Sequence, residues 1–237
     1  MTTYKGIKGL SLQTVAGDPS NLAAGDIWYD SVARKVQGAK IAAGTWASGG
    51  NMNQAGEGGA MAGIQTAAFY AGGNRPGSDT SALSEEYDGS AWAEGSNLNT
   101  GRRSVPGAGT QTAGLCISGI DPAKANVEHY DGTSWSEEAD VNSARGYCEA
   151  TGTTTAALFW GSPATEQWNG TAWTEVADLN TARNQSTGNT GTSTAALAAG
   201  GPPGRAVVET WDGSSWTEIA DLNTGRGNLG GGGTTSL

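Results

Sequence analysis

One stretch of eighteen residues recurs along the chain, and this repetition limits the fold more than any other feature. The clearest copy is ETWDGSSWTEIADLNTGR, from Glu209 to Arg226. Similar copies end at Arg183, Arg145 and Arg102, and a weaker fifth copy, GTWASGGNMN, occupies residues 44–53. The tryptophans of the five copies lie 46, 43, 38 and 43 residues apart, at Trp46, Trp92, Trp135, Trp173 and Trp216. This period is typical of β-propellers and other repeat arrays.

Each period divides into four parts that read as four short strands. The first part follows an arginine and is rich in glycine, and the second is apolar and ends on glycine. The third carries Tyr or Trp with a glutamate two residues earlier, and the fourth carries the recurring tryptophan. Asp-Gly or Asn-Gly lies between the third and fourth parts, which predicts a two-residue type I′ hairpin turn. Four antiparallel strands per period describe a propeller blade.

Composition agrees with an all-β chain. Glycine occupies 39 of the 237 positions and charged residues only 15%. No segment keeps apolar residues at i, i+3, i+4 and i+7, so the sequence predicts almost no helix. The two cysteines, Cys116 and Cys148, fall at different positions of successive repeats. We therefore expect free, partly buried thiols and no disulfide.

The glycine doublets, the Glu-x-aromatic-Asp-Gly hairpins and the following tryptophans resemble kelch repeats over residues 54–237. This resemblance implies a β-propeller. The chain departs from the kelch pattern by one residue between the tyrosine and the tryptophan, and intact doublets occur only at Gly72-Gly73 and Gly200-Gly201. Ligand sites of kelch enzymes are therefore not transferred to this sequence.

The two ends of the chain hold the parts of one more blade. Residues 226–233 are in register for a first strand, and residues 27–30, 35–41 and 45–50 are candidates for the other three. We expect a propeller of five blades over residues 23–237, with residues 23–53 and 223–237 forming the shared blade. Residues 1–22 would be an N-terminal attachment arm. The alternative is that the sequence is a fragment of a longer fibre.

Charge and targeting signals exclude some partners. The net charge is −10, and residues 44–237 alone hold eight basic and twenty acidic side chains. Such an acidic surface repels phosphate, which disfavours nucleic acid as a partner. The N-terminus shows no apolar signal-peptide core, and nothing approaches the ~20 apolar residues of a membrane span. We expect neither secretion by a signal peptide nor a membrane partner.

The sequence offers no constellation for catalysis, a metal or a cofactor. Two glutamates recur in every blade, and a residue present in all blades is explained by blade structure better than by a single active site. The only histidine, His129, is expected to be a solvated strand residue. The glycine run 230–233 has no Walker lysine, so it does not predict a phosphate loop. We expect a protein that is not an enzyme and has no cofactor.

The segments between the second and third strands differ from blade to blade. They span residues 74–84, 120–127, 162–165 and 202–208, and they hold five of the seven prolines. Because equivalent loops of a propeller emerge on one face, we expect these four to form the binding face. The charged candidates in these loops are Arg75, Asp79, Asp121, Lys124 and Arg205. The alternative is that unconstrained loops simply vary.

The chain also resembles repeat proteins encoded by marine tailed phages. The matching features are the start MTTYKGIKGLSLQTV, the segment GDIWYDSVARKVQ, the GTWASGG link and the LNTAR and GT-x-TAAL-x-x-GG repeats. The resemblance implies a virion structural protein of the fibre, tail or capsid surface. Its partners would be other virion proteins through the arm, and a host surface receptor or glycan. A homo-oligomer is also expected from the resemblance, and a carbohydrate-binding adhesion module is the alternative function.

Overall fold

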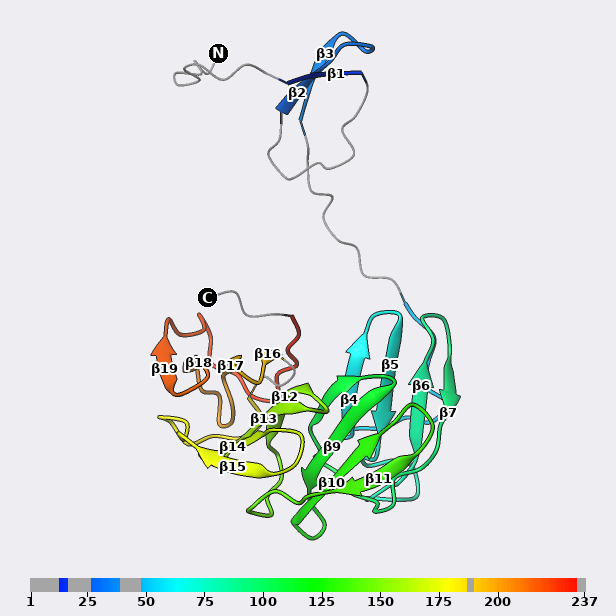
Figure 1. The fold of residues 1–237 in the computed structure, drawn as a ribbon, viewed down its shortest axis with the longest axis vertical. Coiled ribbons are helices and arrows are strands. Elements are labelled where there is room, and N and C mark those ends of the chain that lie inside the picture. The colour runs from blue at the N-terminus through cyan, green and yellow to red at the C-terminus, as the bar shows by residue number, and fades with distance from the viewer. Residues whose placement is uncertain (1–12, 17–26, 39–47, 187–189, 234–237) are drawn as a thin grey trace. The chain divides into compact units, whose positions relative to one another are not determined.

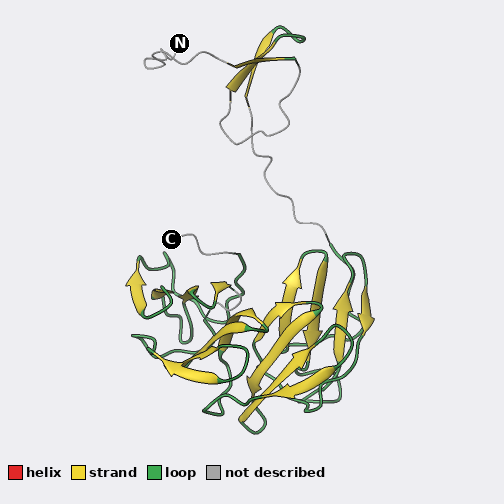
Figure 2. Cartoon of the chain, in the orientation of Figure 1, coloured by secondary structure: helices red, strands yellow, loops and turns green. Residues whose placement is uncertain are grey.

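The computed structural model describes residues 13–16, 27–38, 48–186 and 190–233. The chain divides into a small unit, Met1–Ser48, and a large unit, Gly49–Leu237. Every regular element in the described ranges is a β-strand, which confirms the all-β prediction (Figure 2). Within these ranges, no helix has the length and apolar character needed to cross a membrane.

The large unit contains four sheets of four antiparallel strands, which follow one another along the chain (Figure 1). Blade 1 comprises β4 (Ala60–Ile64), β5 (Ala67–Ala71), β6 (Ser84–Tyr87) and β7 (Trp92–Glu94). Blade 2 comprises β8 (Gly107–Thr110), β9 (Ala113–Gly119), β10 (Lys124–Tyr130) and β11 (Trp135–Glu138). Blade 3 comprises β12 (Glu149–Thr153), β13 (Ala156–Trp160), β14 (Thr165–Trp168) and β15 (Trp173–Val176). Blade 4 comprises β16 (Gly191–Thr192), β17 (Ala195–Ala199), β18 (Val208–Trp211) and β19 (Trp216–Ile219). The sheets are the blades that the repeat predicted.

The turn between the third and fourth strands differs in detail from the prediction. In blade 2 the central residues of the turn are Gly132 and Thr133, because the Asp131 N–H donates to the Ser134 carbonyl at 3.2 Å. Gly132 has a φ of 90°, as a type II′ turn requires at its first central position. The Asp131 carboxylate accepts the N–H groups of Thr133 and Ser134, each at 2.8 Å. Aspartate therefore supports the turn through its side chain and does not occupy its centre.

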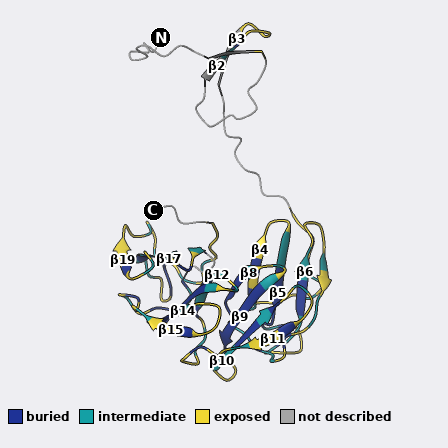
Figure 3. Cartoon of the chain, viewed as in Figure 1, coloured by how far each residue is buried: buried dark blue, intermediate teal, exposed yellow. Residues whose placement is uncertain are grey.

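The recurring tryptophans lie between neighbouring blades. Trp135, Trp173 and Trp216 hold the same position in β11, β15 and β19 and are 7%, 6% and 5% exposed, as predicted. In Figure 3 the buried residues of the large unit lie mainly on its strands. Trp135 packs against Phe69 of blade 1, with ring centroids 5.5 Å apart. Trp92 of blade 1 is only half-buried, and Trp46 lies outside the described residues. Apolar contact between blades therefore forms the core of the large unit.

A polar cluster, which we call the clamp, joins each blade to the segment before it. In blade 2 the clamp consists of Asn99, Thr100 and Arg102, and it binds the carboxylate of Glu128. One carboxylate oxygen accepts the N–H and side-chain amide of Asn99 at 2.7 and 3.1 Å. The other accepts the Thr100 N–H at 3.2 Å and the Arg102 guanidinium at 2.9 Å. The asparagine amide also donates to the carbonyl of Trp135 at 3.1 Å.

Three further glutamates are held by equivalent clamps. The carboxylate of Glu85 accepts a hydrogen bond from Asn53. The carboxylate of Glu166 accepts from Asn142 and Arg145, and that of Glu209 accepts from Asn180 and Arg183. All four glutamates are at most 1% exposed. A buried carboxylate is stable only with such charge-assisted partners, so this set of repeated glutamates is structural. The second set, Glu94, Glu137, Glu175 and Glu218, is exposed on the outer strands.

The innermost strands of the four blades line a common pocket. Residues of β4, β8, β12 and β16, together with Gly231, Gly232 and Gly233, form its wall, and its volume is about 390 Å³. Each inner strand holds a glycine with positive φ at the same position, as in Gly109 at 100°. A Cβ on Gly109 would lie 2.2 Å from the carbonyl oxygen of Ala113, so the inner strand must turn on glycine here.

The C-terminal segment runs beside the inner strand of blade 4. Gly233 forms a parallel bridge with Thr190, and its carbonyl accepts the Gly191 N–H at 2.9 Å. Residues 226–233, predicted to be a lone first strand, form this single bridge and no regular strand. Four blades are described in full, and the count of five remains a prediction.

The small unit contains one described sheet of three strands. β1 (Gln13–Val15) pairs in parallel with β2 (Ile27–Asp30), and β2 pairs antiparallel with β3 (Lys35–Gly38). Residues 13–15 of the expected arm thus form a strand, and the rest of the arm, apart from Ala16, lies outside the described residues. Of the strand candidate at residues 45–50, residues 45–47 also lie outside them. The shared blade of residues 23–53 and 223–237 stays a prediction.

Candidate functional site

The four variable loops share one face of the large unit, as expected. At each loop a backbone N–H donates to the carbonyl of the clamp arginine that follows the blade. These bonds join Gly73 to Arg102, Gly119 to Arg145, Ser162 to Arg183 and Gly201 to Arg226, at 2.9 to 3.4 Å. The Asp-Gly turns lie at the opposite ends of the strands, because Gly89, Gly132, Gly170 and Gly213 each approach the turn between the first and second strands. Loops and hairpin turns therefore occupy opposite faces.

Arg75 is a structural residue and not part of an exposed binding face. Its guanidinium lies 2.6 Å from the carboxylate of Glu85, and the residue is 4% exposed. The reason is a substitution in the repeat: Gly56 stands at the position that a clamp arginine holds in the later copies. Arg75 reaches the same carboxylate from the loop, so the prediction that it contacts a partner is corrected.

Lys124 also differs from its prediction, because it begins strand β10 and is not in a loop. Its carbonyl accepts the Ser118 hydroxyl at 2.8 Å, and the register of β9 and β10 shifts between Lys124 and Val127. Asp121 is exposed and pairs with Arg103. Asp79 is exposed, and the Arg205 side chain donates to the carbonyl of Pro202 at 3.2 Å. Asp79, Asp121 and Arg205 therefore remain candidates on the loop face.

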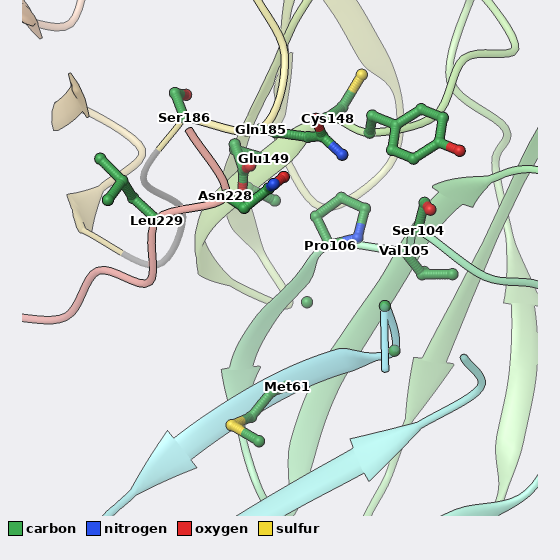
Figure 4. A pocket seen from close by; sticks show the side chains of 15 residues that line it. Met61, Ser104, Val105, Pro106, Cys148, Glu149, Gln185, Ser186, Asn228 and Leu229 are labelled. Carbon is green, nitrogen blue, oxygen red and sulfur yellow. The ribbon is translucent and has the colours of Figure 1, made fainter. Parts of the chain in front are cut away.

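A pocket of about 250 Å³ lies at the end of the inner strands and is lined by those strands and by the connections that lead into them, not by the four variable loops (Figure 4). Its wall receives one residue with a left-handed backbone from each repeat: Gly58, Ser104, Tyr147, Gln185 and Asn228, with φ between 49° and 65°. Four of these residues are not glycine, so each carries a side chain in a conformation that side chains seldom adopt. Because these four side chains all differ, each repeat places a different chemical group on the wall of the pocket.

Glu149 is the ionisable residue that the sequence analysis did not select. It lies half-buried on the wall of this pocket, where Ala60 and Pro106 stand in the first two repeats (Figure 4). Withdrawal of its carboxyl from water raises the pKa of Glu149 well above its usual range. The sequence did contain a signal for Glu149, because a charged residue stands at a position where the first two repeats have alanine and proline.

Tyr147 connects the pocket to the loops. It is 40% exposed and also lines a neighbouring hollow with Ser162, Gln185 and Pro202, which belong to the loops and connections of blades 3 and 4. An exposed aromatic ring beside amides and a carboxyl provides both an apolar face and hydrogen-bonding groups. The pocket is therefore suited to a polar organic ligand or to a peptide side chain.

No described group of three or more His, Cys, Asp or Glu side chains could hold a metal ion. His129 Nδ1 lies 3.5 Å from the Glu138 carboxylate, and both side chains are partly exposed. Cys116 and Cys148 are free and buried, as expected. Burial raises the pKa of each thiol to about 12, so both thiols stay protonated near neutral pH.

A comparison with solved structures supports the propeller fold. The structure of YjhT, a kelch-type β-propeller, superposes with a TM-score of 0.61 and 11% sequence identity. The match covers 74% of this chain and 68% of that one. No protein-family model matches the sequence, and no curated protein matches it either. At this identity the likeness shows the fold alone.

Proposed function

We propose that this β-propeller is a non-enzymatic structural protein of a phage virion, located in a fibre, the tail or the capsid surface. Its loop face would contact a host surface receptor or a neighbouring subunit, and its N-terminal arm would attach it to other virion proteins. One observation carries the binding role. The ionisable groups repeated at Glu85 and its equivalents are buried in clamps, whereas the residues that differ between blades gather around one pocket.

The virion location rests on the sequence resemblance. The N-terminal segments, the GTWASGG link and the kelch-like LNTAR repeats are the features shared with phage repeat proteins.

The chemistry of the pocket supports a binding role without catalysis. Its wall combines Glu149 with the amides of Gln185 and Asn228 and the hydroxyl of Ser104. The other ionisable members of the wall are Tyr147 and Cys148, and a thiol with a pKa of about 12 is a poor nucleophile. Among the described wall residues this leaves Glu149 and Tyr147 as ionisable groups, without a histidine or a second carboxylate.

A carbohydrate-binding adhesion module is the second candidate. The observation in its favour is Tyr147, which is 40% exposed and lines the same pocket as Gln185 and Glu149. An aromatic face next to amide and carboxyl groups can stack on a sugar ring and bond its hydroxyls. This aromatic residue lies in the connection between blades 2 and 3, so the variable loops alone did not reveal it.

The location is tested by mass spectrometry of purified phage particles, with the protein expected in stoichiometric amounts. Its absence from particles would remove the virion assignment.

The binding role is tested by exchanging exposed loop residues while leaving Arg75 in place. Residues 76–79, 121–123 and 202–204 are replaced by Gly/Asn segments of equal length, and attachment of the purified protein to host cells is measured. We expect attachment to fall about tenfold or more. The matched control replaces Ser90, Thr133 and Ser214, in the turns of the opposite face, by Asn and should attach normally.

Tyr147→Ala distinguishes the two candidates. Loss of binding to isolated host glycans in this variant, with the three loops intact, would favour the carbohydrate module. Attachment that survives both the loop exchange and Tyr147→Ala would contradict both.

A further inference from the structure

The end of blade 4 carries a fifth copy of the clamp. Its residues are Leu222, Asn223, Thr224 and Arg226, in the sequence LNTGR. The preceding copy, LNTAR at residues 179–183, binds Glu209 through two N–H groups, one amide and one guanidinium.

The backbone of the fifth clamp is held in the same way as that of the fourth. The Leu222 N–H donates to the Ala206 carbonyl at 2.9 Å, as the Leu179 N–H donates to Pro163 at 3.2 Å. Gly201 donates to the carbonyl of Arg226 at 2.9 Å. The Arg226 side chain donates to the carbonyl two residues earlier at 3.3 Å, a contact that Arg183 also makes. The fold thus places the donors of the fifth clamp as it places those of the others.

The donors of the fifth clamp face no carboxylate in the described ranges of the chain. Arg226 is exposed, whereas Arg102 and Arg183 are at most 4% exposed on their glutamates. The clamp asparagines are exposed in the other copies as well, so the arginine marks the difference. Oriented N–H groups and a guanidinium at this spacing bind one carboxylate in three of the four other copies. In the first copy the guanidinium comes instead from Arg75 in the loop.

Apolar surface accompanies these donors. Leu222 is half-buried, although its equivalents Leu98, Val141 and Leu179 are at most 4% exposed. Ile219 is 45% exposed at the position where Val176 packs against the core shared with the next blade. In the other copies these residues lie against the following blade, which supplies both the glutamate and the aromatic side chains.

We infer that the fifth clamp is a docking site for a β-hairpin of another polypeptide, one that carries a glutamate two residues before an aromatic residue. The glutamate would bind Asn223, Thr224 and Arg226, and the aromatic side chains would cover Leu222 and Ile219. This site lies on the side of blade 4 that corresponds to the side facing the next blade in the other copies, and its backbone is hydrogen-bonded to loop residues 205 and 206.

The chain's own glutamates do not suit this site. All four repeated glutamates are buried in their own clamps, so a second copy could offer one only by opening a blade interface. The predicted shared blade would place residues 23–53 on this site. Aligning Trp46 with Trp216 puts Ala39 at the position of Glu209, so that copy supplies no carboxylate for the clamp. A different polypeptide is therefore the partner that the charges favour.

The test uses the full chain and a backbone-cyclised peptide that copies residues 206–219, AVVETWDGSSWTEI. Binding is measured by fluorescence anisotropy of the labelled peptide. Two peptide variants separate the carboxylates: Glu209→Gln should bind about tenfold more weakly or worse, because it loses the charge-assisted bonds. Glu218→Gln removes an equal charge on the exposed strand and should bind about as well as the parent.

Protein variants provide the matching test. Arg226→Gln and Asn223→Ala should each weaken binding of the parent peptide about tenfold. Arg34→Gln, which removes one exposed arginine of the small unit, should have no effect. Because Asn223 and Arg226 are exposed, the melting temperature of both variants should stay unchanged, so the loss cannot be ascribed to unfolding.

Failure of the parent peptide to bind, or equal binding of the Glu209→Gln peptide, would overturn the inference. Self-association of the protein that Arg226→Gln abolishes would also overturn it, since the partner would then be a second copy.

Discussion

At the residue scale, two arginines that look alike in the sequence have opposite roles. Arg75 and Arg205 both follow a glycine doublet by a few residues, but only Arg75 lies on a buried carboxylate. We predict that Arg75→Met lowers the free energy of unfolding by about 3 kcal/mol, because Glu85 loses its cation. Arg205→Met should cost less than about 0.5 kcal/mol. Urea denaturation of the two variants measures the difference, and equal costs would contradict the structural role of Arg75.

Glu149 should make stability fall as the pH rises. At low pH its carboxyl is protonated in the folded and the unfolded chain and has no effect. As the pH passes the usual value of 4.5, the unfolded chain ionises first, because burial holds the folded pKa well above that value. The free energy of unfolding should therefore decline until the pH reaches the folded pKa. In contrast, Glu209, whose folded pKa is lowered, stabilises the protein above its unfolded pKa.

Glu149→Gln isolates this effect. The variant should be more stable than the parent near neutral pH, and the difference should vanish near pH 4 (about the pH where both forms are protonated). Urea denaturation at several pH values from acid to neutral measures it. A difference that does not change with pH would show that the side chain acts through packing.

At the element scale, the strand with the recurring tryptophan does not contribute equally in every blade. Trp173 is 6% exposed between blades 2 and 3, whereas Trp92 is only half-buried in blade 1. We predict that Trp173→Ala costs about 3–5 kcal/mol through lost burial and a cavity. Trp92→Ala should cost clearly less. Thermal melting of both variants checks the order, and a reversed order would contradict the packing described.

The strands and their order could be predicted because each local signal occurs four times in one register. The tryptophans, the apolar second strands and the common face of the loops all followed from this repetition. The role of Arg75 could not be derived from the sequence of its loop. Arg75 binds Glu85 because Gly56, in the connection before β4, stands where the later copies have the clamp arginine. The start of β10 at Lys124 depends on pairing with Gly119, and a variable segment carries no pattern for such pairing.

At the scale of the whole molecule, the clamps and the apolar clusters join each blade to the next in sequence order. Such an array is stable only where each blade face is covered, and the fourth blade is covered on one side by blade 3. Gly233 forms a bridge beside its inner strand, and Gly231, Gly232 and Gly233 line the pocket between the inner strands. The end of the C-terminal segment therefore packs with the inner strands, even without a regular strand of its own.

Deletion of residues 227–237 tests this contribution while leaving the fifth clamp intact. The deletion removes the bond from the Asn228 N–H to the Gln185 carbonyl and the bond from Gly191 to the Gly233 carbonyl. It also removes Leu229 from the wall of the pocket. We expect a loss of about 2 kcal/mol in the free energy of unfolding, since a typical internal hydrogen bond contributes about 1 kcal/mol. Deletion of residues 234–237 alone is the control and should leave these bonds in place. An unchanged melting temperature in the longer deletion would show that blades 1 to 4 hold together without the segment, and that their inner strands need no fifth strand.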